Sequence, residues 1–340
     1  MNIEIARLRD SWDAYVTATA PDSLYHRWVW RDVIQETFGH NPYYLTAVEN
    51  GTIRGILPLF SIRSLLFGNS LISVPFSSYG GVIADNDRAS EALLAKAVEL
   101  GRQLGAHHIE LRQGDSRSMS WPMSCSKVTM EVQLPGTIDD YCNQLSPSRR
   151  KKLRYGLKRG LRAEWGGSEA VSIFYKIFAT NMRNLGTPVY PKSFFDNQMR
   201  YLGEKTRILS LWDGATPVAA SFVTAHLGTL ELPWAASLPE SRRKEAPMLM
   251  YWALIQKAIE NGFRKVDLGR CSPGGGTYEF KRHWNPVERP LHWYHWPTAE
   301  AAATSSSSDS QKIRLATTLW KRLPLIVANS LGPRLVRSIP

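Results

Sequence analysis

The chain has 340 residues, of which 43% are hydrophobic and 11% aromatic, a composition that excludes a wholly disordered protein. Its mean hydropathy of −0.27 argues against a polytopic membrane protein, and its length predicts two domains or one large one. No signal peptide is recognisable in residues 1–10. The three dispersed cysteines predict neither a zinc site nor a disulfide framework, and they fit a cytoplasmic protein.

The net charge of +12 is concentrated in two segments. Residues 149–162 contain eight bases and no acid, and residues 301–340 contain six bases and one acid. The remainder of the chain is therefore close to neutral. A polyanionic partner is expected at one of these two segments.

The first half of the chain predicts a hairpin followed by a helix and a buried strand. Residues 43–49 and 53–60 read as strands joined by Asn50 and Gly51, which favour the positive φ angles of a tight turn. Residues 89–104 carry an apolar helical face that ends at Gly105, and the strand 108–112 follows.

The second half shows the same succession. Strands at 206–212 and 218–223 flank a turn at Asp213 and Gly214, and a helix at 247–260 precedes the strand 265–268. We infer a duplicated α/β unit, although hairpins followed by helices are common enough to recur by chance. The intervening residues 138–185 are predicted to be helical.

A glycine-rich loop follows the strand that ends near Asp267, and a turn with Tyr278, Glu279 and Lys281 comes next. Ligands of open α/β folds bind at this edge of the sheet, where glycines let backbone N–H groups approach them. Lys281 could stabilise an oxyanion or a phosphate, and the alternative is a solvated loop with a surface lysine. His292 and His295 lack companion ligands at metal spacing, so no metal site is predicted.

This stretch resembles the FemAB/FemX-like branch of the GNAT acyltransferase superfamily. Segments 73–81, 148–152 and 182–188 point more narrowly to the FemAB-related proteins of PEP-CTERM/exosortase and exopolysaccharide systems, with a BioF2-like acetyltransferase domain. The resemblance spans most of residues 1–300. The matching residues of the motif are Asp267, Gly269, Arg270, Gly276, Thr277, Tyr278, Phe280, Lys281 and Trp284.

The resemblance implies an α/β (α+β) fold of two tandem GNAT-like domains, at 1–135 and 136–300, each a mixed central sheet flanked by helices. Well-known members transfer an aminoacyl group from aminoacyl-tRNA, whereas ordinary GNAT enzymes use acyl-CoA held at a glycine turn. The equivalent residues 242–247 lack both glycines, so the usual pyrophosphate cradle is not expected. The long tRNA-contacting arm is also missing. Both donors stay open, and no tightly bound cofactor is expected.

The resemblance also implies site residues. Lys281 would contact the carbonyl or a phosphate, and Asp267 and Glu279 are candidate bases, with a structural pairing of Asp267 to Arg270 as the alternative. The basic run is either a phosphate clamp or a solvated helix face; nucleic acid ranks third, because only Tyr155 could stack on a base. The candidate binding residues are Arg270, Gly275, Gly276, Tyr278, Tyr190, Tyr79, Arg149, Arg150 and Lys151.

We therefore expect an acyl- or aminoacyltransferase that acts on an amine or hydroxyl of a cell-envelope or exopolysaccharide precursor. This precursor would be a phosphorylated or lipid-linked glycan. The alternative is a catalytically silent protein that binds a glycan-lipid precursor. No sequence-specific nucleic-acid recognition is expected.

The end of the chain predicts a Ser-rich linker at 301–310 and a basic amphipathic tail at 311–340. Leu315, Leu319 and Leu323 form one helical stripe beside Trp320, and Pro324 interrupts it. Such a tail suits the anionic inner face of a membrane, which would place the protein in the cytoplasm and at that surface. The alternative is that the tail packs on the protein's own core or on a second subunit.

Overall fold

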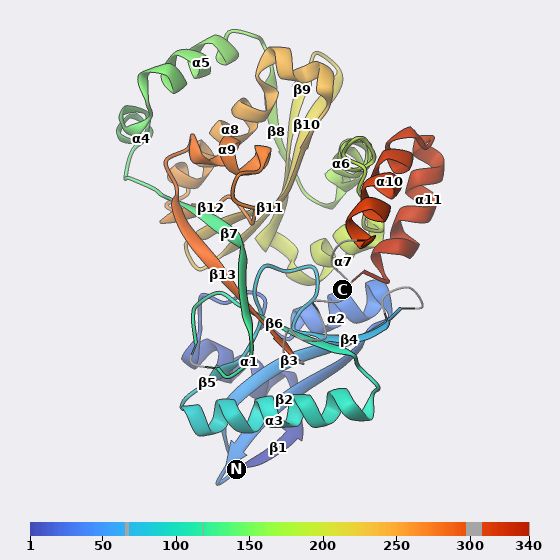
Figure 1. Cartoon of the computed structure of the whole chain (residues 1–340). Coiled ribbons are helices and arrows are strands. Elements are labelled where there is room, and N and C mark those ends of the chain that lie inside the picture. Colours follow the sequence, from blue (N-terminus) through green and yellow to red (C-terminus); the bar gives the residue numbers. More distant parts are fainter. Residues whose placement is uncertain (65–67, 118, 297–307, 340) are drawn as a thin grey trace. The chain divides into compact units, whose positions relative to one another are not determined.

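The computed structural model describes residues 1–64, 68–117, 119–296 and 308–339 (Figure 1). The chain divides into two compact units. Unit 1 comprises Met1–Ser126, Pro290–Ile313 and Arg334–Pro340, and unit 2 comprises Lys127–Arg289 and Arg314–Pro333.

Unit 1 contains a mixed sheet with a short extra strand, β5 (Ile83–Ala84), paired to β3. Two helices, α1 (Arg9–Thr19) and α2 (Val29–Phe38), connect the first two strands, and α3 (Asp87–Gln103) connects β4 to its parallel neighbour β6. All other pairs of this sheet are antiparallel. Its strand order is β1 (Asn2–Ile5), β2 (Asn41–Glu49), β3 (Thr52–Ser64), β4 (Gly68–Ile72), β6 (His108–Gln113) and β13 (Val287–Trp296).

Unit 2 repeats this arrangement. Helices α6 (Val171–Leu185) and α7 (Lys192–Leu202) connect the first two strands, and α8 (Ala246–Glu260) connects β11 to its parallel neighbour β12. It adds α4 (Ile138–Gln144), α5 (Pro147–Leu157) and α9 (Gly276–Arg282). Its strand order is β8 (Arg162–Gly166), β9 (Thr206–Asp213), β10 (Thr216–His226), β11 (Thr229–Ser237), β12 (Lys265–Asp267) and β7 (Met123–Gln133).

Both predicted hairpins are confirmed. Glu49 pairs with Thr52, and the two turn residues between them, Asn50 and Gly51, have φ angles of 51° and 74°. Asp213 pairs with Thr216 across a second two-residue turn, in which Gly214 has a φ of 58°. Because each hairpin occupies the same position in the strand order of its unit, the topology supports a duplicated α/β unit.

The last strand of each unit comes from the other half of the chain. β7 follows β6 in sequence but pairs with β12, and β13 follows β12 but pairs with β6. The units therefore divide inside these two strands, after Ser126 and after Arg289, rather than at the predicted boundaries 135/136 and 300. A strand pattern identifies a strand but not its partner, which is why the exchange was not foreseen.

Helix–sheet packing builds the two cores. α3 begins at Asn86, whose side chain accepts a hydrogen bond from the Ala89 N–H, and its apolar face packs on β2 and β3 (Figure 1). α8 carries Pro247 in its first turn, and it is apolar along most of its length because it is buried against the strands of unit 2. Helices α6 and α8 lie on opposite faces of these strands (Figure 1).

The tail forms two helices, α10 (Ser308–Arg322) and α11 (Leu325–Val336), with Pro324 between them. Ala328, Gly332 and Val336 form a buried stripe of α11, and a Cβ on Gly332 would lie 2.9 Å from the Val189 nitrogen. The predicted linker 301–310 lies outside the described residues except for its last three, which begin α10. Among the described helices, none has the length and apolar character that crossing a bilayer requires.

Candidate functional site

Three carboxylates occupy adjacent positions on three neighbouring strands of unit 2. Asp267 on β12 pairs with Glu131 on β7 and with Glu231 on β11. Residues directly opposite in a sheet share a face, and the apolar neighbours Val132 and Val266 belong to the core under α8. The three acids therefore point to the other face of the sheet.

Burial distinguishes two of these acids from a surface acidic cluster, while Glu131 is partly exposed and pairs with Lys265 and Arg289. Asp267 is 8% exposed and Glu231 is 7% exposed. Sequence reasoning found Asp267 but missed Glu131 and Glu231. The available signal was an acid placed between apolar residues of a buried strand, a position that charged side chains seldom occupy without a role.

Two short hydrogen bonds hold Asp267 in place. Its Oδ1 accepts from the Thr129 hydroxyl at 2.5 Å and from the Gly269 N–H at 2.8 Å. Burial raises the pKa of Asp267, and the charge of Glu131 adds to this effect, against the two hydrogen bonds and the ammonium of Lys281. A carboxyl with a raised pKa suits proton transfer near neutral pH.

Lys281 is buried, which excludes the alternative of a surface lysine on a solvated loop. It lies on α9 at 4% exposure, and its ammonium donates to the Gly269 carbonyl at 2.7 Å and to the Arg270 carbonyl at 3.2 Å. Burial lowers the pKa of Lys281. Since an ammonium has three N–H donors, these two bonds leave one for another acceptor. Lys281 therefore anchors the loop that follows β12.

Gly269 is required where this loop passes β11. Its φ is 75°, and a Cβ there would lie 2.7 Å from the Leu232 carbonyl oxygen. β11 continues to Ser237, but it pairs with β12 only from Thr229 to Glu231. The two strands therefore stop pairing directly after Glu231 and Asp267, beside the Lys281 ammonium.

The outer side of α9 carries other predicted site residues. The Tyr278 hydroxyl donates to the Glu288 carboxylate at 3.0 Å, and Glu279 is exposed and paired with Arg282 at 3.5 Å. Glu279, predicted as a base, thus faces solvent while Lys281 faces inward. The Gly275 N–H donates to the Ser272 carbonyl, so it does not point to a ligand as predicted, and Gly276 opens α9.

The predicted basic run divides into structural and exposed members. Arg149 is 7% exposed, with its guanidinium 5.5 Å from the centre of the Trp284 ring, and burial lowers its pKa. Arg150 donates to the Asn143 carbonyl at 3.0 Å, whereas Lys151 is exposed. Arg149 therefore serves packing, and a phosphate clamp would depend on the exposed bases of α5.

The two predicted wall tyrosines belong to aromatic clusters. Tyr190 lies among unit 2 aromatics, 5.3 Å from Phe194 and 6.2 Å from Trp234 between ring centres. Tyr79 belongs to unit 1, where its ring meets Tyr25 edge-on at 4.9 Å. The structure thus brings together Asp267, Lys281 and the loop that contains Arg270.

The turn before α8 lacks glycine. Glu245 adopts a left-handed φ of 60° directly before α8, a conformation that glycine adopts more readily. Its carboxylate pairs with Lys152 of α5 at 3.1 Å, and the neighbouring Lys244 pairs with Asp213 at 2.7 Å. The start of α8 is therefore flanked by ion pairs.

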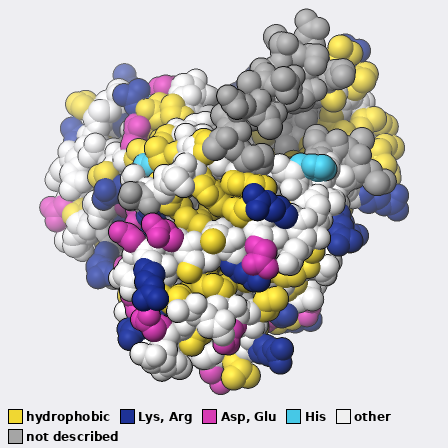
Figure 2. Space-filling view, turned by 60° about the horizontal axis from the view of Figure 1, so that its bottom comes forward, with side chains coloured by type: hydrophobic (Ala, Val, Ile, Leu, Met, Phe, Trp, Pro, Cys, Tyr) yellow, Lys and Arg dark blue, Asp and Glu magenta, His cyan; other side chains and the backbone are white. Residues whose placement is uncertain are grey.

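On the face that Figure 2 shows, Lys and Arg side chains are mixed with acidic and apolar ones and form no continuous basic surface.

Comparison with known proteins supports the fold assignment. Residues 147–282 match the family model described as an acetyltransferase (GNAT) domain, and no curated protein matches the chain significantly. The crystal structure of FemX has a TM-score of 0.65 at 14% identity, covering 86% of this chain and 97% of its own.

Two further solved structures are similar over comparable lengths. The C-terminal domain (DUF2156) of a putative lysylphosphatidylglycerol synthetase from Agrobacterium fabrum has a TM-score of 0.57 at 13% identity, with 88% and 96% coverage. A tandem GNAT protein from the clavulanic acid biosynthesis pathway has a TM-score of 0.54 at 11% identity, with 87% and 98% coverage. The predicted fold class is confirmed: the chain has the mixed α/β fold of tandem GNAT proteins, and its residues 147–282 match the GNAT acetyltransferase domain model.

Proposed function

We propose that the protein transfers an acyl or aminoacyl group to an amine or hydroxyl of a cell-envelope or exopolysaccharide precursor. The observation that carries this proposal is the row Glu131, Asp267 and Glu231, in which Asp267 and Glu231 are buried and Asp267 interacts with the charge of the Lys281 ammonium. Three of these four residues lie within the segment that matches the GNAT acetyltransferase domain.

The chemistry assigns a role to each group. The acceptor nitrogen or oxygen attacks the donor carbonyl carbon, the bond from that carbon to the donor's leaving group breaks, and Asp267 takes the acceptor's proton. The remaining N–H of Lys281 would stabilise the negative charge that develops on the carbonyl oxygen. Burial is the main factor that favours protonation of Asp267, and the charge of Glu131 adds to it although Glu131 is paired with Lys265.

The donor is acyl-CoA or aminoacyl-tRNA, both of which carry phosphates. The exposed bases Lys151 and Arg154 lie on α5, which packs against α8, and the exposed Lys158 follows α5 directly. They support an anionic donor or acceptor bound at α5. The Glu245 carboxylate at the start of α8 disfavours a pyrophosphate at that helix end.

The tail supports an acceptor at the inner face of a membrane. Leu315 and Leu319 of the predicted stripe are 64% and 60% exposed, Leu323 is partly exposed, and Ile326 of α11 is 84% exposed. Residues 311–340 contain six bases and no acid, so the exposed apolar side chains lie in a positively charged segment. A lipid-linked precursor would meet the protein at this surface.

The test is acceptor-dependent consumption of a donor. Acetyl-CoA, a long-chain acyl-CoA and aminoacyl-tRNA are each offered with nucleotide-linked and polyprenyl-diphosphate-linked amino sugars. We expect turnover with one pair and a loss of at least 100-fold in Asp267→Asn, which keeps an oxygen to accept from Thr129 and Gly269. The exposed Glu260→Gln is the matched control.

A second candidate, a silent protein that binds a glycan-lipid precursor, is favoured by Glu245 in place of a glycine at the start of α8. Binding of a polyprenyl-diphosphate sugar without consumption of any donor would support this candidate and contradict the transferase.

A further inference from the structure

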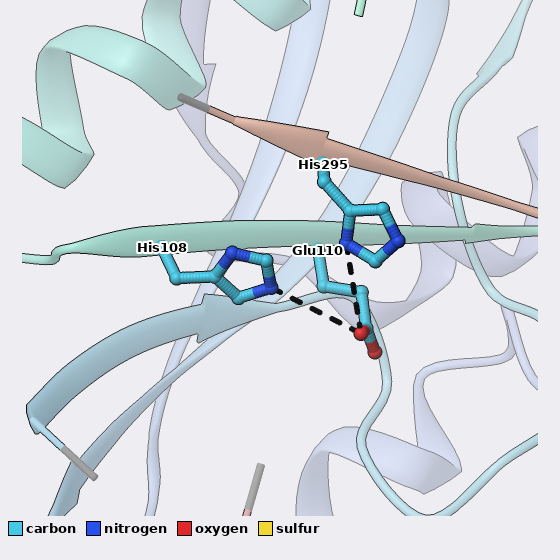
Figure 3. A group of neighbouring side chains, drawn as sticks. All are labelled: His108, Glu110 and His295. Atoms are coloured by element: carbon cyan, nitrogen blue, oxygen red, sulfur yellow. Dashed lines mark ion pairs between the residues drawn. The ribbon is translucent and has the colours of Figure 1, made fainter. Parts of the chain in front are cut away.

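Unit 1 carries a cluster of two histidines and a glutamate on one face of its sheet. Glu110 on β6 lies directly opposite His295 on β13, and His108 precedes Glu110 by two residues on the same face. Figure 3 shows the three side chains pointing toward one another from these two strands. His108 and Glu110 are far from His295 in the sequence, so the spacing of these residues along the chain did not predict the cluster.

The distances in the cluster fit a metal ion better than direct hydrogen bonds. Glu110 Oε2 lies 4.0 Å from His108 Nε2 and 3.9 Å from His295 Nδ1, and the three ligand atoms lie within 4.8 Å of one another. Direct hydrogen bonds would shorten these separations to about 3 Å. Ligand atoms around a tetrahedral zinc ion lie about 3.4 Å apart, so the two imidazole rings would have to rotate to bring their nitrogens closer to Glu110 and to each other.

Neighbouring groups orient the ligands as they do in metal centres. The other carboxylate oxygen of Glu110 accepts from the Arg112 guanidinium at 2.7 Å, and the Ser124 hydroxyl lies 3.0 Å from His295 Nε2. Metal-binding histidines commonly bond their second nitrogen in this way. The ion pair with Arg112 fixes the Glu110 carboxylate, and its other oxygen, Oε2, is the one nearest to both imidazoles.

The positions of unit 2 that correspond to this cluster carry different side chains. In the repeated topology, Lys265 corresponds to His108, Asp267 to Glu110, and Glu131 to His295. The Lys265 ammonium pairs with Glu131 at 2.7 Å, so unit 2 supplies its own cation to the acids. Unit 1 has imidazoles in place of that lysine and its partner acid, and the Arg112 guanidinium is the cation that pairs with Glu110. The two imidazoles therefore leave neutral nitrogen ligands beside the free carboxylate oxygen.

We propose that His108, Glu110 and His295 bind one divalent transition-metal ion, with Zn²⁺ as the representative ion. Two imidazoles and a carboxylate suit borderline ions such as zinc rather than magnesium or calcium. The His108 and His295 side chains are 36% and 28% exposed, so solvent can provide the fourth ligand. The ion would join β13, which arrives from the other half of the chain, to β6.

The test uses the full chain without a histidine tag, after treatment with a chelator. Titration calorimetry with Zn²⁺ should show one ion per chain, and Zn²⁺ should raise the melting temperature. His108→Ala and Glu110→Gln should each weaken binding at least tenfold. His107→Ala is the control, because this exposed histidine is adjacent in sequence but outside the cluster.

The absorption spectrum of the Co²⁺ form identifies the ligand type. Ligation by imidazole and carboxylate gives no intense near-ultraviolet thiolate band, whereas binding at Cys125, Cys142 or Cys271 would give one. Absence of binding, equal affinity in the variants and the wild type, or a thiolate band would each overturn the proposal. His108→Gln provides a second, polar replacement at this partly exposed position if either other variant fails to fold.

Discussion

The buried ammonium of Lys281 and the carbonyl oxygen of Gly269 are 2.7 Å apart. The N–H of the same glycine donates to Asp267 Oδ1 at 2.8 Å. One peptide segment therefore connects the two side chains to which we assign the chemistry. A change in either side chain should alter the position of the other through this loop.

Removal of the Lys281 ammonium should destabilise the protein. Lys281→Ala leaves the buried carbonyl of Gly269 and the partly buried carbonyl of Arg270 without their donor, at a cost of about 1–3 kcal/mol in the free energy of unfolding. Urea denaturation measures this loss, with the exposed Lys257→Ala as control. A stability equal to the wild type would contradict the anchoring role.

Lys281→Met separates anchoring from chemistry, because it keeps the apolar stem of the side chain and removes only the charge. The change in unfolding free energy gives the fraction of the variant that is folded. If Lys281 stabilises the developing oxyanion, turnover should fall at least tenfold further than this folded fraction explains. Turnover that follows the folded fraction alone would remove Lys281 from the mechanism.

Two glycines with the same backbone conformation should respond differently to a methyl group. Gly269 and Gly274 have φ angles of 75° and 74°, but a Cβ at Gly274 meets no atom within 4 Å. Gly274→Ala should cost about 1 kcal/mol from its left-handed conformation. Gly269→Ala should cost at least about 3 kcal/mol, because its Cβ would also collide with the Leu232 carbonyl. Equal losses by chemical denaturation would show that the approach to β11 is not constrained.

The Asp267→Asn variant should become more stable than the wild type as the pH rises. Burial raises the pKa of the folded Asp267 above its unfolded value, so the folded state holds the proton longer and the wild type loses stability with increasing pH. Asparagine carries no titrating group and escapes this loss. Denaturation curves from pH 4 to pH 8 measure the difference, and a variant that is less stable at pH 8 would indicate a stabilised carboxylate.

Unit 1 should lose stability in mild acid through His26. Its Nε2 lies 2.8 Å from the Gly81 carbonyl and its Nδ1 lies 2.6 Å from the Ser23 hydroxyl, and burial lowers its pKa from 6.5 to about 4. The neutral His26 ring makes its full contribution to the free energy of unfolding above pH 6.5, and this contribution declines as the pH falls to about 4. The loss is on the order of 3 kcal/mol, since a tenfold change in proton affinity corresponds to about 1.4 kcal/mol. Melting of His26→Gln should depend less on pH, and an unchanged profile would refute this assignment.

The tail should bind anionic vesicles through its exposed apolar face. Replacement of Leu319 and Ile326 by serine leaves the buried stripe of α11 intact, so it should reduce flotation with phosphatidylglycerol vesicles without unfolding the tail. Leu8→Ser, at a position that is 69% exposed, is the control. Salt should weaken the binding, because it screens the basic side chains. Equal flotation of the variant and the control would contradict membrane contact, and so would absence of flotation for the wild type.

The sequence determined features that depend on residues close to one another. Asn50 with Gly51, and Gly214, marked the hairpins because few other residues adopt their positive φ angles. The apolar face of α3 and the apolar length of α8 marked the two crossover helices, because burial selects those patterns. The glycine-rich loop before Lys281 was visible for the same local reason.

Tertiary structure alone decided which strands became partners. Every strand offers the same backbone donors and acceptors, so the residues of β7 and β13 could not show that each pairs in the other unit. That pairing places Glu131 beside Asp267 and His295 beside Glu110, and it therefore creates both candidate sites. The inward direction of Lys281 was likewise set by the loop carbonyls that only the closed fold brings to its ammonium.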